Sequence, residues 1–115
     1  MGVGILISSD LMFISKVKEV AAASHGEVKV VRSLEALKGA VADVGSPGAI
    51  MIDLEKSRIS IDSLVEPISR LTQAGWKVVS FFSHVHEEVG AEASRLGLGE
   101  VMPRSKFVRV LPALF

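Results

Sequence analysis

The sequence predicts a doubly wound α/β domain, in which a five-stranded parallel sheet carries helices on both faces. Short apolar runs alternate with segments whose apolar residues recur at helical spacing. The third run, Ala49–Asp53, is apolar up to its last residue, as expected of a central parallel strand. Strands that alternate with helices form a parallel sheet covered on both faces. The 115 residues suit a single domain, 1–115.

The first half of the chain divides into two strands and two helices. The first strand is predicted over Gly4–Ile7, and either Ser9 or Asp10 can cap the helix that follows. Gly26 ends that helix, and the second strand is predicted over Val28–Val31. A second helix, capped by Ser33, ends at the breaker Gly45-Ser46-Pro47-Gly48.

The second half continues the alternation. Residues 54–62 are predicted to form a loop, and a third helix runs to about Ala74 with Pro67 in its first turn. The fourth strand is predicted at about Trp76 to Phe82, followed by a helix from Glu87 to about Leu96. Glu100 to Pro103 form a short fifth strand. The remaining residues, 104–115, hold at most two or three helical turns.

Composition excludes several function classes. The formal net charge is zero, so nothing resembles the basic excess of a nucleic-acid-binding domain. A small basic cluster, Arg104, Lys106 and Arg109, could contact nucleic acid or an acidic partner, but a solvated helix face is the simpler interpretation. There is no cysteine, which rules out disulfides and cysteine metal sites. Without a signal peptide or a membrane-spanning run, we expect a cytoplasmic protein.

Candidate functional residues follow the strands. Ligands of doubly wound sheets bind beyond the carboxyl ends of the strands. The residues at those ends are Ser9, Asp10, Asp53, Phe82, Ser83 and Arg104. Asp53 and Asp10 could together hold a magnesium ion through oxygen ligands, and one of them could attack a phosphoryl group.

Simpler structural roles remain open for the same residues. Asp53 could cap the following turn or form an ion pair with Arg104, which would fill the pocket. Asp10 could serve as the N-cap of the first helix. His84 and His86 could bind a metal or act as a base, although surface loop histidines are expected more often.

No complete catalytic motif is present. Gly2 and Gly4 precede the first strand, whereas a dinucleotide-binding fingerprint needs its glycines after the strand. Ser83 beside His84 is adjacency and not a catalytic triad, since neighbouring side chains on an extended strand point apart. We therefore expect a protein that is not an enzyme.

The order of these motifs resembles the receiver domain of two-component response regulators. The resemblance covers the whole chain and runs from Asp10 through Asp53 and Ser83-His84 to Pro103-Arg104. It implies a flavodoxin-like sheet with strand order 2-1-3-4-5 and a short fifth helix. It also implies that Asp53 is the phospho-accepting aspartate.

The chain departs from the receiver pattern at several positions. In receiver domains the first strand is followed by a pair of acidic residues. Here Ser9-Asp10 stands in their place, so one carboxylate is lost. Arg104 matches the family's lysine, with Lys106 two residues later. Either Phe82 or Ser83 takes the switch position that normally carries a hydroxyl. The lost carboxylate weakens divalent-ion binding, because ligand charge sets much of the affinity. An arginine in place of the compact lysine changes how a phosphate is held.

The resemblance and its departures lead to three functional hypotheses. The first is a stand-alone pseudo-receiver that needs no cofactor and acts through protein contacts with a separate output protein. The second is a divergent receiver phosphorylated by a histidine kinase, with magnesium held by Asp10, Asp53 and the backbone carbonyl of Glu55, and the phosphate held by Arg104. The third is a small flavodoxin-like enzyme or ligand-binding domain.

The C-terminal segment is unusually apolar. Its apolar residues are Val108, Val110, Leu111, Ala113, Leu114 and Phe115. They could pack over the sheet, or they could form an exposed patch covered by a second subunit or partner. If they are exposed, the resemblance to receiver domains implies a homodimer through the fourth helix, the fifth strand and this segment.

Overall fold

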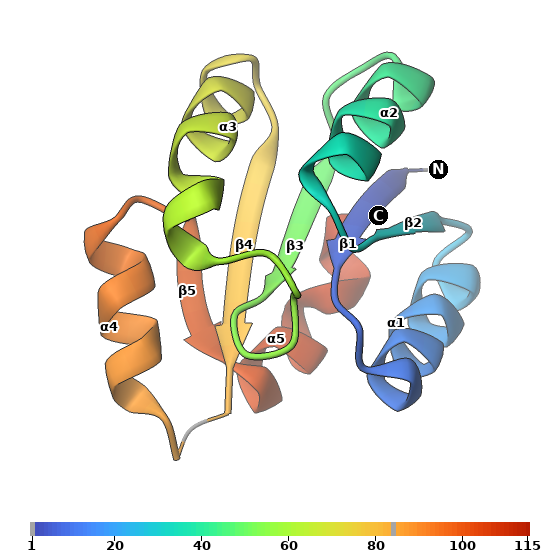
Figure 1. Cartoon of the computed structure of the whole chain (residues 1–115). Helices are drawn as coiled ribbons and strands as arrows, with labels where there is room; N and C mark the ends of the chain where they lie inside the picture. The colour runs from blue at the N-terminus through green and yellow to red at the C-terminus, as the bar shows by residue number, and fades with distance from the viewer. Residues whose placement is uncertain (1, 84) are drawn as a thin grey trace.

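A computed structural model describes residues 2–83 and 85–115. The elements, in chain order, are β1 (Val3–Ile7), α1 (Leu11–Ala23), β2 (Glu27–Val31), α2 (Leu34–Val44), β3 (Ala49–Asp53), α3 (Ile61–Gln73), β4 (Lys77–Phe82), α4 (Glu87–Arg95), β5 (Glu100–Pro103), α5 (Arg104–Val110) and the 3₁₀ helix η1 (Leu111–Leu114). The strands form one parallel sheet in the order β2-β1-β3-β4-β5, as Figure 1 shows. The predicted fold class and strand order are confirmed.

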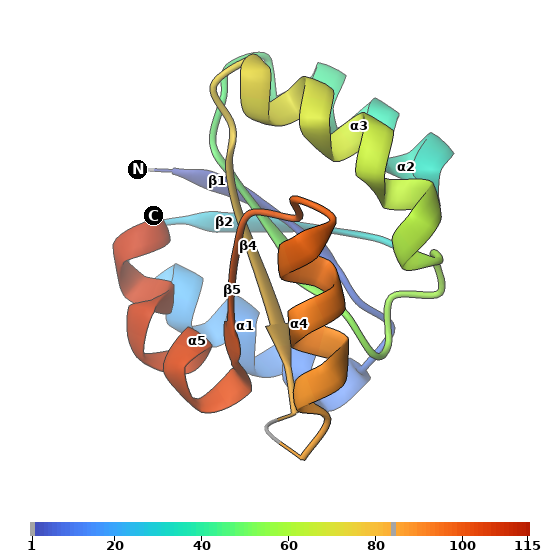
Figure 2. The ribbon, with the colours of Figure 1, turned by 90° about the vertical axis from the view of Figure 1, so that its left-hand side faces the viewer.

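Helices cover the sheet on both faces. Figure 2 shows α1 and α5 on one face and α2, α3 and α4 on the other. Each face has its own core, because successive side chains of a strand point to opposite sides. Ile5 and Ile7 of β1 point toward α2, α3 and α4, whereas Leu6 points toward α1 and α5.

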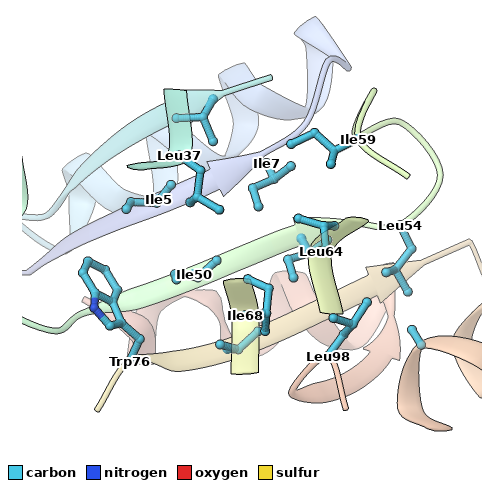
Figure 3. Packing of buried hydrophobic residues seen from close by; sticks show 14 of the residues in the cluster. Ile5, Ile7, Leu37, Ile50, Leu54, Ile59, Leu64, Ile68, Trp76 and Leu98 are labelled. Atoms are coloured by element: carbon cyan, nitrogen blue, oxygen red, sulfur yellow. The ribbon is translucent and has the colours of Figure 1, made fainter. Parts of the chain in front are cut away.

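The two cores have different compositions. The core under α2, α3 and α4 is built mainly from aliphatic side chains, among them Ile50, Leu64 and Ile68, with Trp76 at one end (Figure 3). The core under α1 and α5 is centred on Phe13, Phe81 and Phe107. The Phe81 and Phe107 rings are stacked with centroids 4.2 Å apart, and Phe13 lies 5.1 Å from Phe81.

Three helices begin at side-chain caps. Asp10, Ser33 and Ser60 each accept a hydrogen bond from the backbone N–H three residues later. Such caps satisfy amide groups that have no partner within the helix. The prediction that Pro67 lies in the first turn of α3 is wrong, because the Ser60 cap starts this helix at Ile61 and leaves Pro67 in its second turn. The buried residues Leu64 and Ile68, on either side of it, hold the helix against the sheet despite the missing N–H.

The apolar C-terminal segment packs on the domain. Phe107 and Leu111 are fully buried, and the Phe115 ring lies against Gly4 and Gly26 at the start of β1 and β2. A Cβ at Gly26 would lie 2.6 Å from this ring, so the glycine makes room for it. The packing alternative is therefore the one observed. The homodimer prediction depended on exposure of these residues, and dimerisation stays untested.

No helix among the described residues is long and apolar enough to cross a membrane.

Candidate functional site

Asp53 lies at the carboxyl end of β3, where it is fully buried. Its Oδ1 accepts hydrogen bonds from the backbone N–H groups of Glu55 at 3.2 Å and Lys56 at 3.1 Å. Its Oδ2 accepts a hydrogen bond from the Ser8 hydroxyl at 2.9 Å. Both carboxylate oxygens thus have partners inside the protein, as a buried charge requires.

Ser8 is a site residue that sequence reasoning missed. Ile7 pairs with Ile52 across the sheet, so the next residues, Ser8 and Asp53, lie side by side. The fully buried Ser8 hydroxyl donates to Asp53 and accepts from the backbone N–H of Asp10 at 3.1 Å. Side-chain alternation could have identified Ser8, because Leu6 and Ser8 point to the same face as Met51 and Asp53.

Arg104, the first residue of α5, closes the site. One guanidinium nitrogen lies 3.8 Å from Asp53 Oδ2 and 3.7 Å from Asp10 Oδ2. The guanidinium carbon is also 4.4 Å from the centroid of the Phe13 ring, within the range of a cation–π interaction. The predicted Asp53–Arg104 pair is therefore present, and the aromatic core holds the cation in position.

One atom of Arg104 is unsatisfied. Its Nε is buried and has no hydrogen-bond partner among the described residues, although 35% of the side chain is exposed. A buried donor without a partner has a free-energy cost. The stacking on Phe13 and the two carboxylates offset that cost.

Asp10 has two roles in the structure. Its Oδ1 accepts the Phe13 N–H at 3.2 Å, which makes it the N-cap of α1, as one of the two interpretations predicted. Its Oδ2 faces Arg104. The Arg104 guanidinium therefore lies near both carboxylates and links Asp10 to Asp53.

The loops after β1 and β3 are tied together at this edge. The backbone N–H and the hydroxyl of Ser9 both donate to the Lys56 carbonyl, at 2.6 and 2.8 Å. Ser9 therefore joins the loops, and it forms no hydrogen bond with Asp53 among the described residues. The next residues of the β3–α3 loop, Ser57 to Ile59, form a turn closed by the Ser57 hydroxyl on the Ile59 carbonyl.

Glu55 connects the β3–α3 loop to the β4–α4 loop. One oxygen of its side chain accepts the backbone N–H of Ser83, and the other contacts Nδ1 of His86, the residue before α4. The predicted role of Glu55 involved only its backbone carbonyl, so these side-chain contacts add to the predicted site. His84 lies outside the described residues.

Phe82, Ser83 and Lys106 form no hydrogen bond or ion pair with Asp53 in the described part of the chain. The Phe82 ring is buried on the opposite face of the sheet, where it fills the space left by Gly90 of α4. Ser83 lines a shallow cavity of about 370 Å³ with Arg104, Ser105 and Val108. Lys106 is exposed and does not line that cavity. Ser83, the residue directly after β4, is thus a hydroxyl residue that lines the same cavity as Arg104.

Two segments that follow strands at this edge of the sheet, the start of α1 and the residue Val85 after β4, expose large apolar side chains. Among the described residues, the large apolar side chains that are mostly exposed are Leu11 (71%), Met12 (87%) and Val85 (68%). Met12 also lines a second open cavity of about 430 Å³, together with Lys16, Lys56 and Arg104.

Comparison with known proteins identifies the fold. No family model matches the chain, and none of the curated proteins matches it in sequence. A solved structure, the receiver domain of the Francisella response regulator 1452, superimposes with a TM-score of 0.69 over 98% of each chain at 12% identity. This chain has the fold of a receiver domain. The identity is too low to carry more than the fold.

Proposed function

We propose that this domain is a pseudo-receiver, a response-regulator-like signalling module that acts through protein contacts without phosphorylation of Asp53. The observation that carries the proposal is the closure of the Asp53 carboxylate. The group is fully buried, and both of its oxygens are engaged by Ser8, two backbone N–H groups and Arg104.

This closure opposes nucleophilic attack. An attacking oxygen must come within about 3–3.5 Å of the reacting atom along an open path. Asp53 presents no surface to a phosphodonor, and the Arg104 side chain, which contacts the Phe13 ring, lies beside both carboxylates. The nucleophilic carboxylate is retained, but residues of the domain itself block the approach of a phosphodonor.

The residues also fit a magnesium ion poorly. Mg²⁺ is held in proteins by oxygen ligands and favours carboxylates. Ser8 places a neutral hydroxyl beside Asp53, and the Arg104 guanidinium lies near both Asp10 and Asp53, where a dication would be repelled. No three side chains of His, Cys, Asp or Glu come together as a metal site at Asp53 or anywhere else in the described part of the chain. We therefore propose a module that works without a cofactor and without enzymatic activity.

A phosphorylation experiment tests the proposal. The wild-type chain and Asp53→Asn are incubated with acetyl phosphate and Mg²⁺, and their intact masses are measured. We expect no phosphoryl adduct on either chain and no change in melting temperature with Mg²⁺. An adduct present on the wild type and absent from Asp53→Asn would instead establish a working phospho-acceptor, which is the competing hypothesis.

A further inference from the structure

A hydrophobic groove lies between α2 and α3, and none of its lining residues belongs to the Asp53 site. α2 packs on β1 and β2, whereas α3 packs on β4. The space between the two helices, which lie on the same face in Figures 1 and 2, holds an open cavity of about 260 Å³. Its walls are Leu34, Leu37 and Val41 of α2 and Pro67 and Leu71 of α3.

The wall residues form two helical stripes. Leu34, Leu37 and Val41 are spaced i, i+3, i+7, so they lie along about 10 Å of one side of α2. Pro67 and Leu71 are spaced i, i+4 and face them from α3. Of the five, only Leu37 is fully buried within the domain. Two facing apolar stripes of this length match the apolar face of about two turns of a third helix.

The size of the groove favours side chains over a small molecule. Pockets for drug-sized ligands are usually enclosed and have volumes of roughly 300–1,000 Å³. This groove is smaller and only partly enclosed. It can accept two or three apolar side chains that project from one face of a bound helix.

The charged residues of the groove specify the charge of its partner. The two charged residues that line it are both cations, Lys38 on α2 and Arg70 on α3. Arg70 also contacts Glu66 at 3.2 Å, but both side chains are largely exposed, and such pairs are weak and easily exchanged. A partner with carboxylates on both sides of its apolar stripe would match Lys38 and Arg70 at once.

We propose that the α2–α3 groove is a docking site for an acidic amphipathic helix of a partner protein. This inference builds on the proposed function, since it names the surface through which the module makes contact. It does not involve Asp53, magnesium or a phosphodonor, so the phosphorylation experiment and the docking experiment can fail separately.

The probe is a pair of synthetic helical peptides of about 14 residues, or four turns. One has leucines at i, i+3, i+4 and i+7 with glutamates flanking them, and its twin has lysines in place of the glutamates. Each is titrated into the isotope-labelled chain, and backbone amide shifts are followed by NMR. We expect the acidic peptide to shift the backbone amides of residues 34–41 and 68–71, since Pro67 has no N–H, and to bind about ten-fold more tightly than the basic twin.

A charge-reversed variant supplies the control. Lys38→Glu with Arg70→Glu changes only exposed side chains, so the fold should persist, and we expect binding of the acidic peptide to weaken about ten-fold. The matched variant, Lys18→Glu with Arg109→Glu, makes the same change in net charge on exposed residues outside the groove and should bind like the wild type. Three results would overturn the proposal: no binding of the acidic peptide, equal weakening in both variants, or shifts centred on Leu11, Met12 and Val85.

Discussion

The two faces of the sheet bury different kinds of side chain, and this difference determines where charge can be held. The face under α2, α3 and α4 is packed mainly with branched aliphatic residues, and the cations Lys38 and Arg70 lie at the exposed rim of its groove. The face under α1 and α5 is packed with Phe13, Phe81 and Phe107, and it borders the Arg104 guanidinium.

Aromatic packing accounts for the closed state of the site. Aliphatic side chains offer a guanidinium only dispersion contacts, whereas an aromatic ring also attracts it through its negative face. Asp53 points to the aromatic face because it pairs with Phe81 and follows the alternation of β3. The carboxylate and the cation therefore meet at the end of this core, and the groove on the opposite face remains free for contacts.

The largest expected effect comes from breaking the aromatic face. Phe81→Ala removes the ring that contacts both Phe13 and Phe107, and large-to-small changes of this kind lower the free energy of unfolding by about 3–5 kcal/mol. Ile52→Ala, one strand away on the aliphatic face, is the matched variant. It should lower the free energy of unfolding by about 2–4 kcal/mol. Urea unfolding measures both. A loss below about 1 kcal/mol in Phe81→Ala would contradict the packing described.

A smaller effect is expected from Arg104. Arg104→Gln removes the cation that faces Asp10 and Asp53 and should lower the free energy of unfolding by about 1–3 kcal/mol, since it leaves buried charge without its partner. Arg104→Lys keeps the charge but loses the flat stacking on Phe13, so its stability should be intermediate.

Arg95 provides the surface comparison for this prediction. Its contact with Glu92 is shorter, 2.6 Å, and raises the pKa of Arg95, yet the pair is exposed to water. Arg95→Gln should therefore leave the urea midpoint nearly unchanged. If Arg95→Gln and Arg104→Gln shift the midpoint equally, the aromatic face has no special role in holding the cation.

Within the site itself, the smallest effect is expected from Ser8. Ser8→Ala removes the hydroxyl that donates to Asp53 Oδ2 and should lower the free energy of unfolding by about 1–2 kcal/mol. Ser15→Ala, an exposed serine of α1, is the control and should have little effect. In the background of Asp53→Asn the Ser8 effect should shrink, which a double-mutant cycle followed by thermal unfolding can measure.

Much of this structure was predictable from local patterns. Apolar periodicity located all five strands to within a residue or so. Residue type and position predicted Ser33 as one helix cap and either Ser9 or Asp10 as another, and the structure selects Asp10. Asp53 stood out because it ends an otherwise apolar strand. The Pro67 error arose because the Ser60 cap was overlooked, and a proline is tolerated where neighbouring side chains are buried.

The contacts of the site were harder to predict. Ser8 carries no signal by itself, since a serine after a strand is common, and it becomes informative only once β1 and β3 are placed in register. The stacking of Arg104 on Phe13 depends on the rotamer of a long side chain and on residues about 90 positions apart in the chain. The Glu55 contacts join two loops whose relative position no periodic pattern fixes.

The most direct test of the account is to restore what the site lacks. In Ser8→Asp combined with Arg104→Lys, a second carboxylate lies beside Asp53 and the stacked guanidinium is gone. Like charges should destabilise this variant without a metal, and Mg²⁺ should recover the loss. After incubation with acetyl phosphate and Mg²⁺, intact-mass measurement should find a phosphoryl adduct on the variant and none on the wild type. Equal phosphorylation of the wild type at Asp53 would contradict the claim that Ser8 and Arg104 keep this carboxylate closed.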